Sequence, residues 1–336
     1  MTRIPLVVTA ILATLAAANV ARPLPAAEPT ARFMPPPGPR SSLSLMTYNV
    51  KGLPFPAAFN RAAALAKIGK NLEALGRTGH RPDIVALQEA FIPEAKAIAK
   101  QAGYRYIAIG PQAADAPAAP VDAAGLRFTG KASWMKGETE GKWVDSGLVI
   151  MSDYPIVATR KMAFARDACA GFDCLAAKGA LIAWVRIPGQ PQPVAIADTH
   201  LNARKASGVP VERANAAYRL QLSALRTFIG RQVDPQTSLI FAGDFNVGHD
   251  ADRVAAARLV METASGATEA TEVAATIPFP SNDLSAVLAR AKDKQYFRAG
   301  QGQMLRYAGI EVPFGLAGKA SALSDHLGYV VRYAFE

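Results

Sequence analysis

The sequence has few cysteines, and this scarcity limits both its cross-linking and its metal chemistry. Among 336 residues there are two, Cys169 and Cys174. A single pair with no second pair nearby argues against a structural zinc site, which needs four ligands. As a disulfide the pair would close a very short loop, which export from the cell favours. Two free thiols are the alternative, and the sequence leaves both open.

Long apolar runs are also scarce. Beyond the N-terminus, no stretch is long and apolar enough to cross a bilayer. Residues 1–27 combine Arg3, an apolar run from Ile4 to Ala18 and small residues before Glu28, which is the pattern of a signal peptide. The run has about 15 residues, fewer than the ~20 of a membrane anchor. We therefore expect a cleaved signal and an exported protein, periplasmic or secreted. A proline-rich linker at residues 28–41 and a folded domain at residues 42–336 would follow.

The charged residues lack runs of one sign. They make up 19% of the chain and leave a net charge of +10. The lysines and arginines are dispersed, which argues against a dedicated nucleic-acid-binding arm. The basic balance still favours an anionic partner, such as nucleic acid, lipid head groups or the cell envelope. Half of the residues are hydrophobic, which is the composition of a folded protein.

Short apolar runs bounded by turn residues predict a series of buried strands. Apolar residues three and four apart predict amphipathic helices at Ala58–Gly76 and Glu212–Ile229, and a shorter helix at Phe91–Gln101. Strands separated by helices in some places and by short turns in others predict an α/β fold with mixed sheets. The expected strands are Leu43–Asn49, Asp83–Glu89, Tyr104–Ile109, Gly147–Met151, Ala180–Ile187, Val194–His200, Leu239–Asp244 and Leu327–Tyr333.

One long segment shows no clear periodicity. It begins with Pro111–Val121, whose alanines and prolines predict a surface loop, and continues through Phe128, Trp134, Met135 and Trp143. The mixture of aromatic residues, glycines and lysines predicts either a β-hairpin or a loop that contacts a ligand or a membrane. A floppy insertion with partly packed aromatic residues is the alternative.

Five short polar clusters lie next to the apolar runs. Because a sheet fixes the backbone and residues at strand ends point into a crevice, we expect these clusters to form one site. Together they supply ligands for one divalent metal, groups for one phosphate and a base for one water. The clusters are Thr47-Tyr48-Asn49, Gln88-Glu89, Asp198-Thr199-His200-Leu201-Asn202, Gly243-Asp244-Phe245-Asn246 and Ser324-Asp325-His326.

The residue types in these clusters suit hydrolysis of a phosphoric ester. Glu89 offers a hard oxygen ligand for Mg²⁺, with Mn²⁺ and Ca²⁺ as alternatives. Alternation along a strand sends Asp244 and Asn246 to the same side, and His200 and Asn202 share that spacing. A carboxylate there can hold the attacking water, an amide can bind a phosphate oxygen, and a histidine can donate to a departing oxyanion.

The cluster Ser324-Asp325-His326 contains the residue types of a serine hydrolase triad. Adjacent residues cannot easily adopt the relay geometry, and the chain has no Gly-x-Ser-x-Gly elbow. We therefore expect His326 to act on water, as a base that a carboxylate strengthens.

In this order, the five clusters resemble the motifs of the endonuclease/exonuclease/phosphatase superfamily, which is also called DNase I-like. The resemblance spans roughly Leu43 to Tyr333. It implies a four-layered α/β sandwich with two packed sheets, and attack of water on a phosphoric ester with Mg²⁺ as cofactor. It also implies that Glu89 is a metal ligand, that Asp325 lies near the metal and that Asn49 lies beside the metal or the phosphate.

The resemblance further assigns the reacting groups. His326 would be the general base, Asp244 would orient the nucleophile, and Asn246 would hold the phosphate. His200 would stabilise or protonate the leaving side.

The sequence departs from the family pattern at one position. Family members often carry a Leu-Asp-Tyr-type motif whose aspartate orients the basic histidine. Here the nearest candidate is Lys292–Phe297. We expect Asp293 to take that role, with Asp283 as the alternative.

Three segments resemble the neutral and bacterial sphingomyelinase branch of the superfamily. They are Tyr48–Pro54, Cys174–Leu181 with its Lys-Gly pair, and Thr199–Ala203. The resemblance implies that Lys178 faces a lipid phosphate or supports the site. We also expect Asn202 to bind the substrate. A solvated lysine in a turn is the alternative for Lys178.

Two kinds of substrate therefore remain open. The first interpretation is an exported, Mg²⁺-dependent phosphodiesterase that removes the head group of a phospholipid such as sphingomyelin, with contact to a membrane surface. The second is an exported nuclease acting on nucleic acid, whose backbone the basic charge would suit, or a phosphomonoesterase of the same superfamily. A metal-free binding module is disfavoured, because a full set of acid, base and metal ligands would be coincidental.

Overall fold

The structure is a computed structural model that describes residues 40–117, 123–278, 280–315 and 323–335. The signal peptide expected at residues 1–27 and nearly all of the linker at residues 28–41 lie outside these ranges. So does the last part of the loop expected at Pro111–Val121. Among the described residues, no helix combines the length and the apolar character needed to span a membrane.

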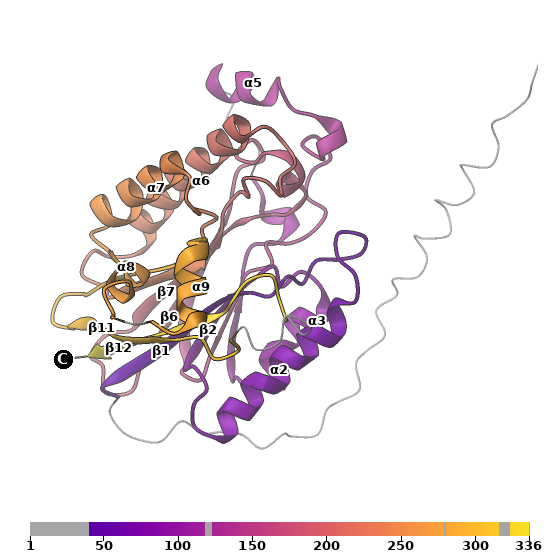
Figure 1. Cartoon of the computed structure of the whole chain (residues 1–336). Helices are drawn as coiled ribbons and strands as arrows, with labels where there is room; N and C mark the ends of the chain where they lie inside the picture. The colour runs from indigo at the N-terminus through magenta and orange to yellow at the C-terminus, as the bar shows by residue number, and fades with distance from the viewer. Residues whose placement is uncertain (1–39, 118–122, 279, 316–322, 336) are drawn as a thin grey trace, which may run out of the picture. The chain divides into compact units, whose positions relative to one another are not determined.

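Two six-stranded sheets form the centre of the described chain (Figure 1). Each sheet has one parallel pair of strands, and its other neighbours are antiparallel. The first sheet contains, in spatial order, β11 (Leu305–Glu311), β12 (Tyr329–Phe335), β1 (Ser42–Asn49), β2 (Ile84–Gln88), β4 (Val149–Ser152) and β3 (Tyr106–Ile109). The second contains β5 (Ile156–Ala163), β6 (Gly179–Val185), β7 (Val194–His200), β8 (Leu239–Asp244), β10 (Asp293–Arg298) and β9 (Thr268–Glu269).

The two sheets pack face to face through an apolar core. Residues two apart on a strand point to the same face, and such residues from both sheets, including Leu43 and Leu45 of β1 and Ile196 of β7, belong to one buried cluster. The outer face of the first sheet is covered by α2 (Arg61–Arg77), α3 (Pro93–Lys96) and α4 (Ile98–Gln101). The outer face of the second is covered by α6 (Val211–Gln232), α7 (Ala251–Arg258) and the π-helical turn η4 (Leu259–Thr263). These four layers confirm the predicted α/β sandwich (Figure 1).

The strand registers bring the polar clusters to one edge of the sandwich. The parallel partners β1 and β2 end together, with Asn49 opposite Gln88. The parallel partners β7 and β8 also end together, with His200 opposite Asp244. Antiparallel β10 begins at the same place, with Asp293 opposite Asp244. The polar residues predicted at the strand ends therefore lie together at one end of both sheets.

Some local predictions differ from the structure. The helix predicted at Phe91–Gln101 is divided at Ala97 into α3 and α4. The segment after residue 122 forms α5 (Ala123–Thr129) and the 3₁₀ turn η2 (Trp134–Lys136), so the β-hairpin prediction is wrong. A buried carboxylate anchors this segment, since Glu138 accepts from Arg213 at 2.7 Å. The other elements are α8 (Ala270–Ala274), α9 (Asn282–Arg290) and the 3₁₀ turns η1 (Ala113–Asp115) and η3 (Gly171–Leu175).

Candidate active site

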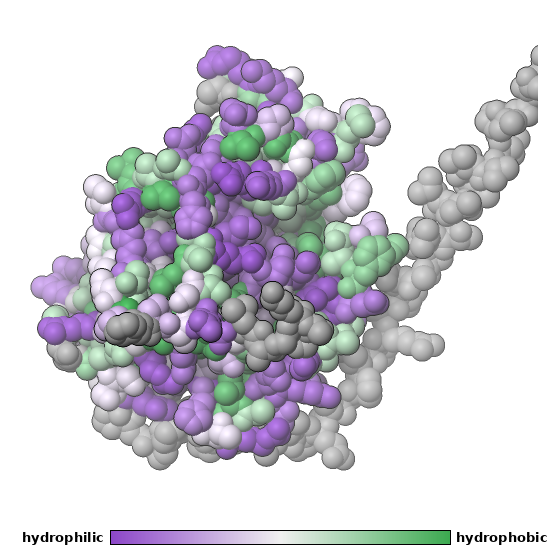
Figure 2. Space-filling model, viewed as in Figure 1, coloured by the Kyte–Doolittle hydropathy of each residue, from purple (hydrophilic) through white to green (hydrophobic). Residues whose placement is uncertain are grey.

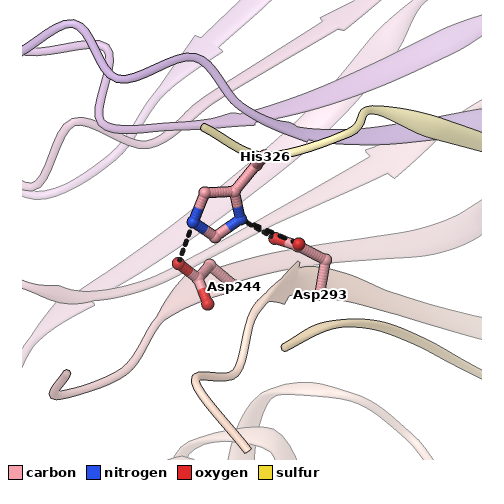
Figure 3. Close-up of side chains that lie close together, drawn as sticks. All are labelled: Asp244, Asp293 and His326. Carbon is pink, nitrogen blue, oxygen red and sulfur yellow. Dashed lines mark hydrogen bonds and ion pairs between the residues drawn. The ribbon is translucent and has the colours of Figure 1, made fainter. Parts of the chain in front are cut away.

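The centre of the site is a histidine held between two carboxylates (Figure 3). His326 lies in the loop before β12, and its Nδ1 is 2.8 and 2.9 Å from the two carboxylate oxygens of Asp293. Its Nε2 is 3.6 Å from Oδ2 of Asp244. Of the two aspartates considered from the sequence, Asp293 makes this contact, because it opens β10 beside the end of β8. Asp283 lies in the first turn of α9.

The two carboxylates change the acidity of this histidine. Burial by itself would lower the pKa of His326, because it disfavours the imidazolium. The negative charges of Asp293 and Asp244 outweigh burial and raise the pKa to about 9. The side chain thus has the environment of a strengthened base, with Nδ1 turned to Asp293 and Nε2 turned to Asp244.

A second group joins the two sheets at the same edge. The amide nitrogen of Asn49, at the end of β1, donates to Oε1 of Glu89 at 3.0 Å and to Oδ2 of Asp244 at 3.1 Å. Glu89 directly follows β2 and has a positive φ of 57°, which is uncommon for a residue with a side chain. Burial raises the pKa of the Glu89 carboxyl, and the hydrogen bond from Asn49 opposes that shift only in part.

These carboxylates fit a hard divalent cation. Glu89 and Asp244 share the Asn49 amide, and Asp244 contributes to the raised pKa of Glu89. Burial and a neighbouring negative charge both destabilise an ionised carboxylate. A bound Mg²⁺ would offset both effects. Asp244, Asp293 and His326 also offer ligand atoms within 4.8 Å of one another.

Asp325, also predicted near the metal, lies at the rim of the site. Its side chain is 55% exposed and pairs with Lys51 at 3.6 Å. Its position therefore differs from that of Glu89, whose side chain is only 17% exposed.

His200 and Lys178 form the side of the site next to β7. The ammonium of Lys178 lies 3.0 Å from Nε2 of His200 and donates to the carbonyl of Leu201 at 3.1 Å. Burial and the positive charge of Lys178 hold the pKa of His200 well below its usual range. His200 is therefore neutral, with Nε2 placed to accept from Lys178. Lys178 is buried, so it is not a solvated lysine in a turn.

The position of Lys178 depends on a short disulfide-closed loop. Cys169 and Cys174 are bonded, which answers the question left open by the sequence. The loop between them carries Asp173, whose Oδ1 pairs with Lys178 at 3.0 Å. The other Asp173 oxygen accepts from the backbone of Ala203. Asp173 was not among the expected site residues, although its place between the two cysteines is a usable sequence signal.

The two remaining amides contact the loop backbone. Oδ1 of Asn202 accepts from Ala170 at 2.9 Å, and its nitrogen donates to Ala203. Asn246, which has a positive φ of 49°, donates from Nδ2 to the carbonyl of Leu201 at 3.0 Å. Both side chains are buried beside the site, and they link the loop after β7 to its neighbours.

A buried polar layer lies one step below the site, between the sheets. Gln88 of β2 donates to Oδ1 of Asp198 on β7 at 2.7 Å and to Thr47 of β1 at 3.3 Å. Burial raises the pKa of the Asp198 carboxyl well above its usual range. Oδ2 of Asp198 and Oε1 of Gln88 have no hydrogen-bond partner among the described residues. Burial therefore favours the neutral acid form of Asp198, and its hydrogen bond with Gln88 ties the two sheets together beneath the reacting groups.

Comparison with known proteins agrees with this arrangement. The model of the Endonuclease/Exonuclease/phosphatase family matches residues 46–261, which is more than half of the chain. The sphingomyelinases of Mycobacterium tuberculosis and Mycobacterium bovis are 26% identical over 301 residues, covering 87% of this chain and 52% of those proteins. The chain thus spans about half the length of these relatives.

Two solved structures show the same fold. A mutant of beta toxin from Staphylococcus aureus, solved with bound magnesium ions, has a TM-score of 0.55 at 16% identity, over 88% of this chain and 100% of that one. D. rerio TDP2, complexed with a single-strand DNA product, has a TM-score of 0.55 at 17% identity, over 88% and 99%. Such identities establish the fold alone. The family match, together with the polar clusters that lie at one end of the two sheets, shows that this chain belongs to the endonuclease/exonuclease/phosphatase family.

Proposed function

We propose that this protein is an exported, Mg²⁺-dependent phosphodiesterase that removes the head group of a phospholipid, in the manner of a sphingomyelinase C. The observation that carries the proposal is His326, held by Asp293 and directed at Asp244 beside the Glu89–Asn49 pair. The 26% identity to sphingomyelinases over most of this chain supports the lipid substrate. Export rests on the N-terminal sequence.

In the proposed reaction, His326 activates water. Asp293 accepts from Nδ1–H of His326 and leaves Nε2 free to take a proton from water, which Asp244 orients. The water oxygen bonds to phosphorus, and the bond from phosphorus to the leaving oxygen breaks. A divalent ion held by Glu89, with Asn49 and Asp244 beside it, would neutralise charge on the phosphoryl oxygens.

The leaving oxygen needs positive charge and a proton. The Lys178 ammonium would supply the positive charge on the β7 side of the site, next to neutral His200, and the proton would come from solvent. A buried positive charge is worth more to a developing oxyanion than the same charge in water. We therefore assign the role first expected of His200 to the Lys178–His200 pair.

Exposed aromatic residues in segments that adjoin site residues along the chain favour a lipid surface. Phe55 is 77% exposed in the loop that follows Asn49. Trp143 is 67% exposed, and its backbone donates to the carbonyl of Leu175, the residue after Cys174. Phe172, the neighbour of Asp173, is also exposed, and Lys136 lies 5.2 Å from its ring. Figure 2 shows hydrophilic residues in the middle of one face, with separate hydrophobic patches around them. Aromatic side chains flanked by lysines suit the interface of a bilayer.

The lipid assignment predicts different effects on surface-bound and soluble substrates. In Trp143→Ser and Phe55→Ser, hydrolysis of vesicle sphingomyelin should fall about ten-fold, because each aromatic side chain adds roughly 1–2 kcal/mol of apolar burial at the interface. Hydrolysis of a soluble diester, bis-p-nitrophenyl phosphate, should remain unchanged. Leu259→Ser is the matched control, since Leu259 is 58% exposed on η4, outside these loops. Equal losses on both substrates, or none on vesicles, would argue against membrane contact by these loops.

Nucleic acid is the second candidate substrate. The net charge of +10 and the likeness in fold to TDP2 with a DNA product favour it. Nicking of plasmid DNA or cleavage of a single strand by the wild type, with no release of phosphocholine from vesicles, would establish it in place of the lipid.

A further inference from the structure

A buried arginine outside the reacting groups joins two loops of the site. Arg253 lies on α7 and is 0% exposed. Its Nη1 donates to the carbonyl of Asn202 at 2.7 Å and to the carbonyl of Asn246 at 2.9 Å. Each carbonyl lies two residues beyond a residue of the proposed reaction, His200 on β7 and Asp244 on β8. One guanidinium thus bonds the backbone that follows two neighbouring strands.

The surroundings of Arg253 hold the guanidinium in one position. Its Nε donates to Oδ1 of Asn215 on α6 at 2.7 Å, and its plane lies over the ring of Tyr218 at 4.4 Å. Asn215 in turn contacts Asp250, the N-cap of α7. Two helices therefore orient the arginine toward the two loops.

Burial of the Arg253 guanidinium is energetically unfavourable, which indicates a specific role for this side chain. Among the described residues, no carboxylate forms a salt bridge with the Arg253 guanidinium, and its Nη2 has no hydrogen-bond partner. Burying a cation without a paired anion is unfavourable unless its hydrogen bonds compensate. Those bonds go mainly to the two loop carbonyls, so the favourable interactions of the buried charge depend on the spacing of the loops.

We propose that Arg253 is a positioning residue that sets the distance between the His200 and Asp244 ends of the site, and so aligns Asp244 with His326. The two loops also bond each other, from Leu201 N to the carbonyl of Asp244 at 3.0 Å and from Asn246 to the carbonyl of Leu201. Arg253, on α7, hydrogen-bonds to both loops and prevents the two loops from moving together relative to the helix. The proposal rests on the proposed function for its effect on rate, but its effect on loop mobility is independent of that function.

The test compares Arg253→Met with a matched variant, Arg81→Met. Arg81 lies just before β2, at the end of that strand away from the site. The side chain of Arg81 is also buried, also lies over a tyrosine ring at 4.4 Å and also donates to a backbone carbonyl, that of Ala102. Unlike Arg253, it also pairs with a carboxylate, that of Asp153. Both variants lose a buried guanidinium, so both should unfold at lower temperature. With the soluble diester, kcat of Arg253→Met should fall roughly 10–10²-fold, the cost of a misplacement near 1 Å, while KM changes little. Arg81→Met should keep kcat within about two-fold of the wild type.

Two further measurements keep the inference testable if Arg253→Met folds poorly or the wild type lacks activity. Arg253→Lys, which reaches one carbonyl at a time, should give an intermediate kcat. Hydrogen exchange should become faster at residues 200–204 and 244–248 in both Arg253 variants, and stay unchanged there in Arg81→Met. Equal kcat losses in the Arg253 and Arg81 variants, or unchanged exchange in these loops, would overturn the proposal. An inactive wild type with faster exchange would contradict the proposed function and support the role of Arg253.

Discussion

The contact between Asp293 and His326 leads to a quantitative prediction about rate. Asp293→Asn keeps the size of the side chain and an oxygen that can accept from Nδ1, but it removes the negative charge. The wild-type contact has two oxygens at 2.8 and 2.9 Å in a buried setting. A hydrogen bond to a charged group is worth about 1.5–3 kcal/mol. If that interaction orients and strengthens the base in the transition state, kcat should fall roughly 10–150-fold.

The same substitution should move the pH dependence in a defined direction. Burial lowers the pKa of His326, and Asp293 and Asp244 raise it to about 9. Removing the Asp293 charge therefore lowers this pKa, so the rising limb of kcat should move to lower pH even as the maximum rate falls. A general acid would show the opposite limb, with activity falling as pH rises.

The assay is initial-rate hydrolysis of a soluble phosphodiester between pH 5 and 10, with thermal unfolding measured on each variant. Asp283→Asn is the control, because Asp283 was the alternative partner from the sequence and lies on α9. We expect it to keep wild-type kcat and pH profile. An Asp293→Asn enzyme with kcat within two-fold of the wild type and an unmoved profile would refute the role of this contact. Equal losses in both variants would refute it as well.

Two other substitutions test the carboxyl groups of Glu89 and Asp198. Glu89→Gln should abolish the increase in melting temperature that Mg²⁺ gives the wild type, because a ligand stabilises only the state that binds it; an equal Mg²⁺ shift in both proteins would exclude Glu89 as a ligand. Asp198→Asn tests the neutral acid between the sheets. Burial raises the pKa of Asp198 in the folded state, so this group favours wild-type stability at low pH. The contribution is lost as pH rises above the unfolded pKa near 4. The loss is about 1.4 kcal/mol per pH unit while the folded state keeps the proton. In urea unfolding from pH 5 to 7, the variant should therefore gain stability relative to the wild type as pH rises, and parallel curves would show that Asp198 is ionised in the fold.

The strand ends of this protein are predictable because the central strands are buried on both faces. β7 and β8 have the predicted bounds, since they lie inside a sheet covered on both sides and appear as continuous apolar runs. β5 was not predicted, because it is an edge strand whose middle residues are exposed. β10 begins with Asp293, Lys294 and Gln295 and has no apolar pattern at its start. Local patterns therefore find strands that are apolar along most of their length, and they miss strands that are exposed or that begin with polar residues.

The residues of the candidate site could be proposed from the sequence, but the contacts among them could not. The resemblance assigned Asp293 to His326, and the contact itself depends on the pairing of β10 with β8, which no local pattern contains. From the sequence, Lys178 could be a site residue or a solvated lysine in a turn. Its ion pair with Asp173, in the loop that the disulfide closes, decides between the two. Arg253 was not considered, because its two carbonyl partners are backbone atoms that carry no side-chain signal.

The central claim is tested most directly by phosphocholine release from sphingomyelin vesicles. The purified protein is freed of metal with EDTA, then assayed with added Mg²⁺ beside His326→Ala, with plasmid DNA offered in parallel. We predict release that requires Mg²⁺, a loss of roughly 10²–10⁴-fold in His326→Ala, and intact plasmid. Release by the wild type that does not exceed that of His326→Ala, or that persists in excess chelator, would contradict the account.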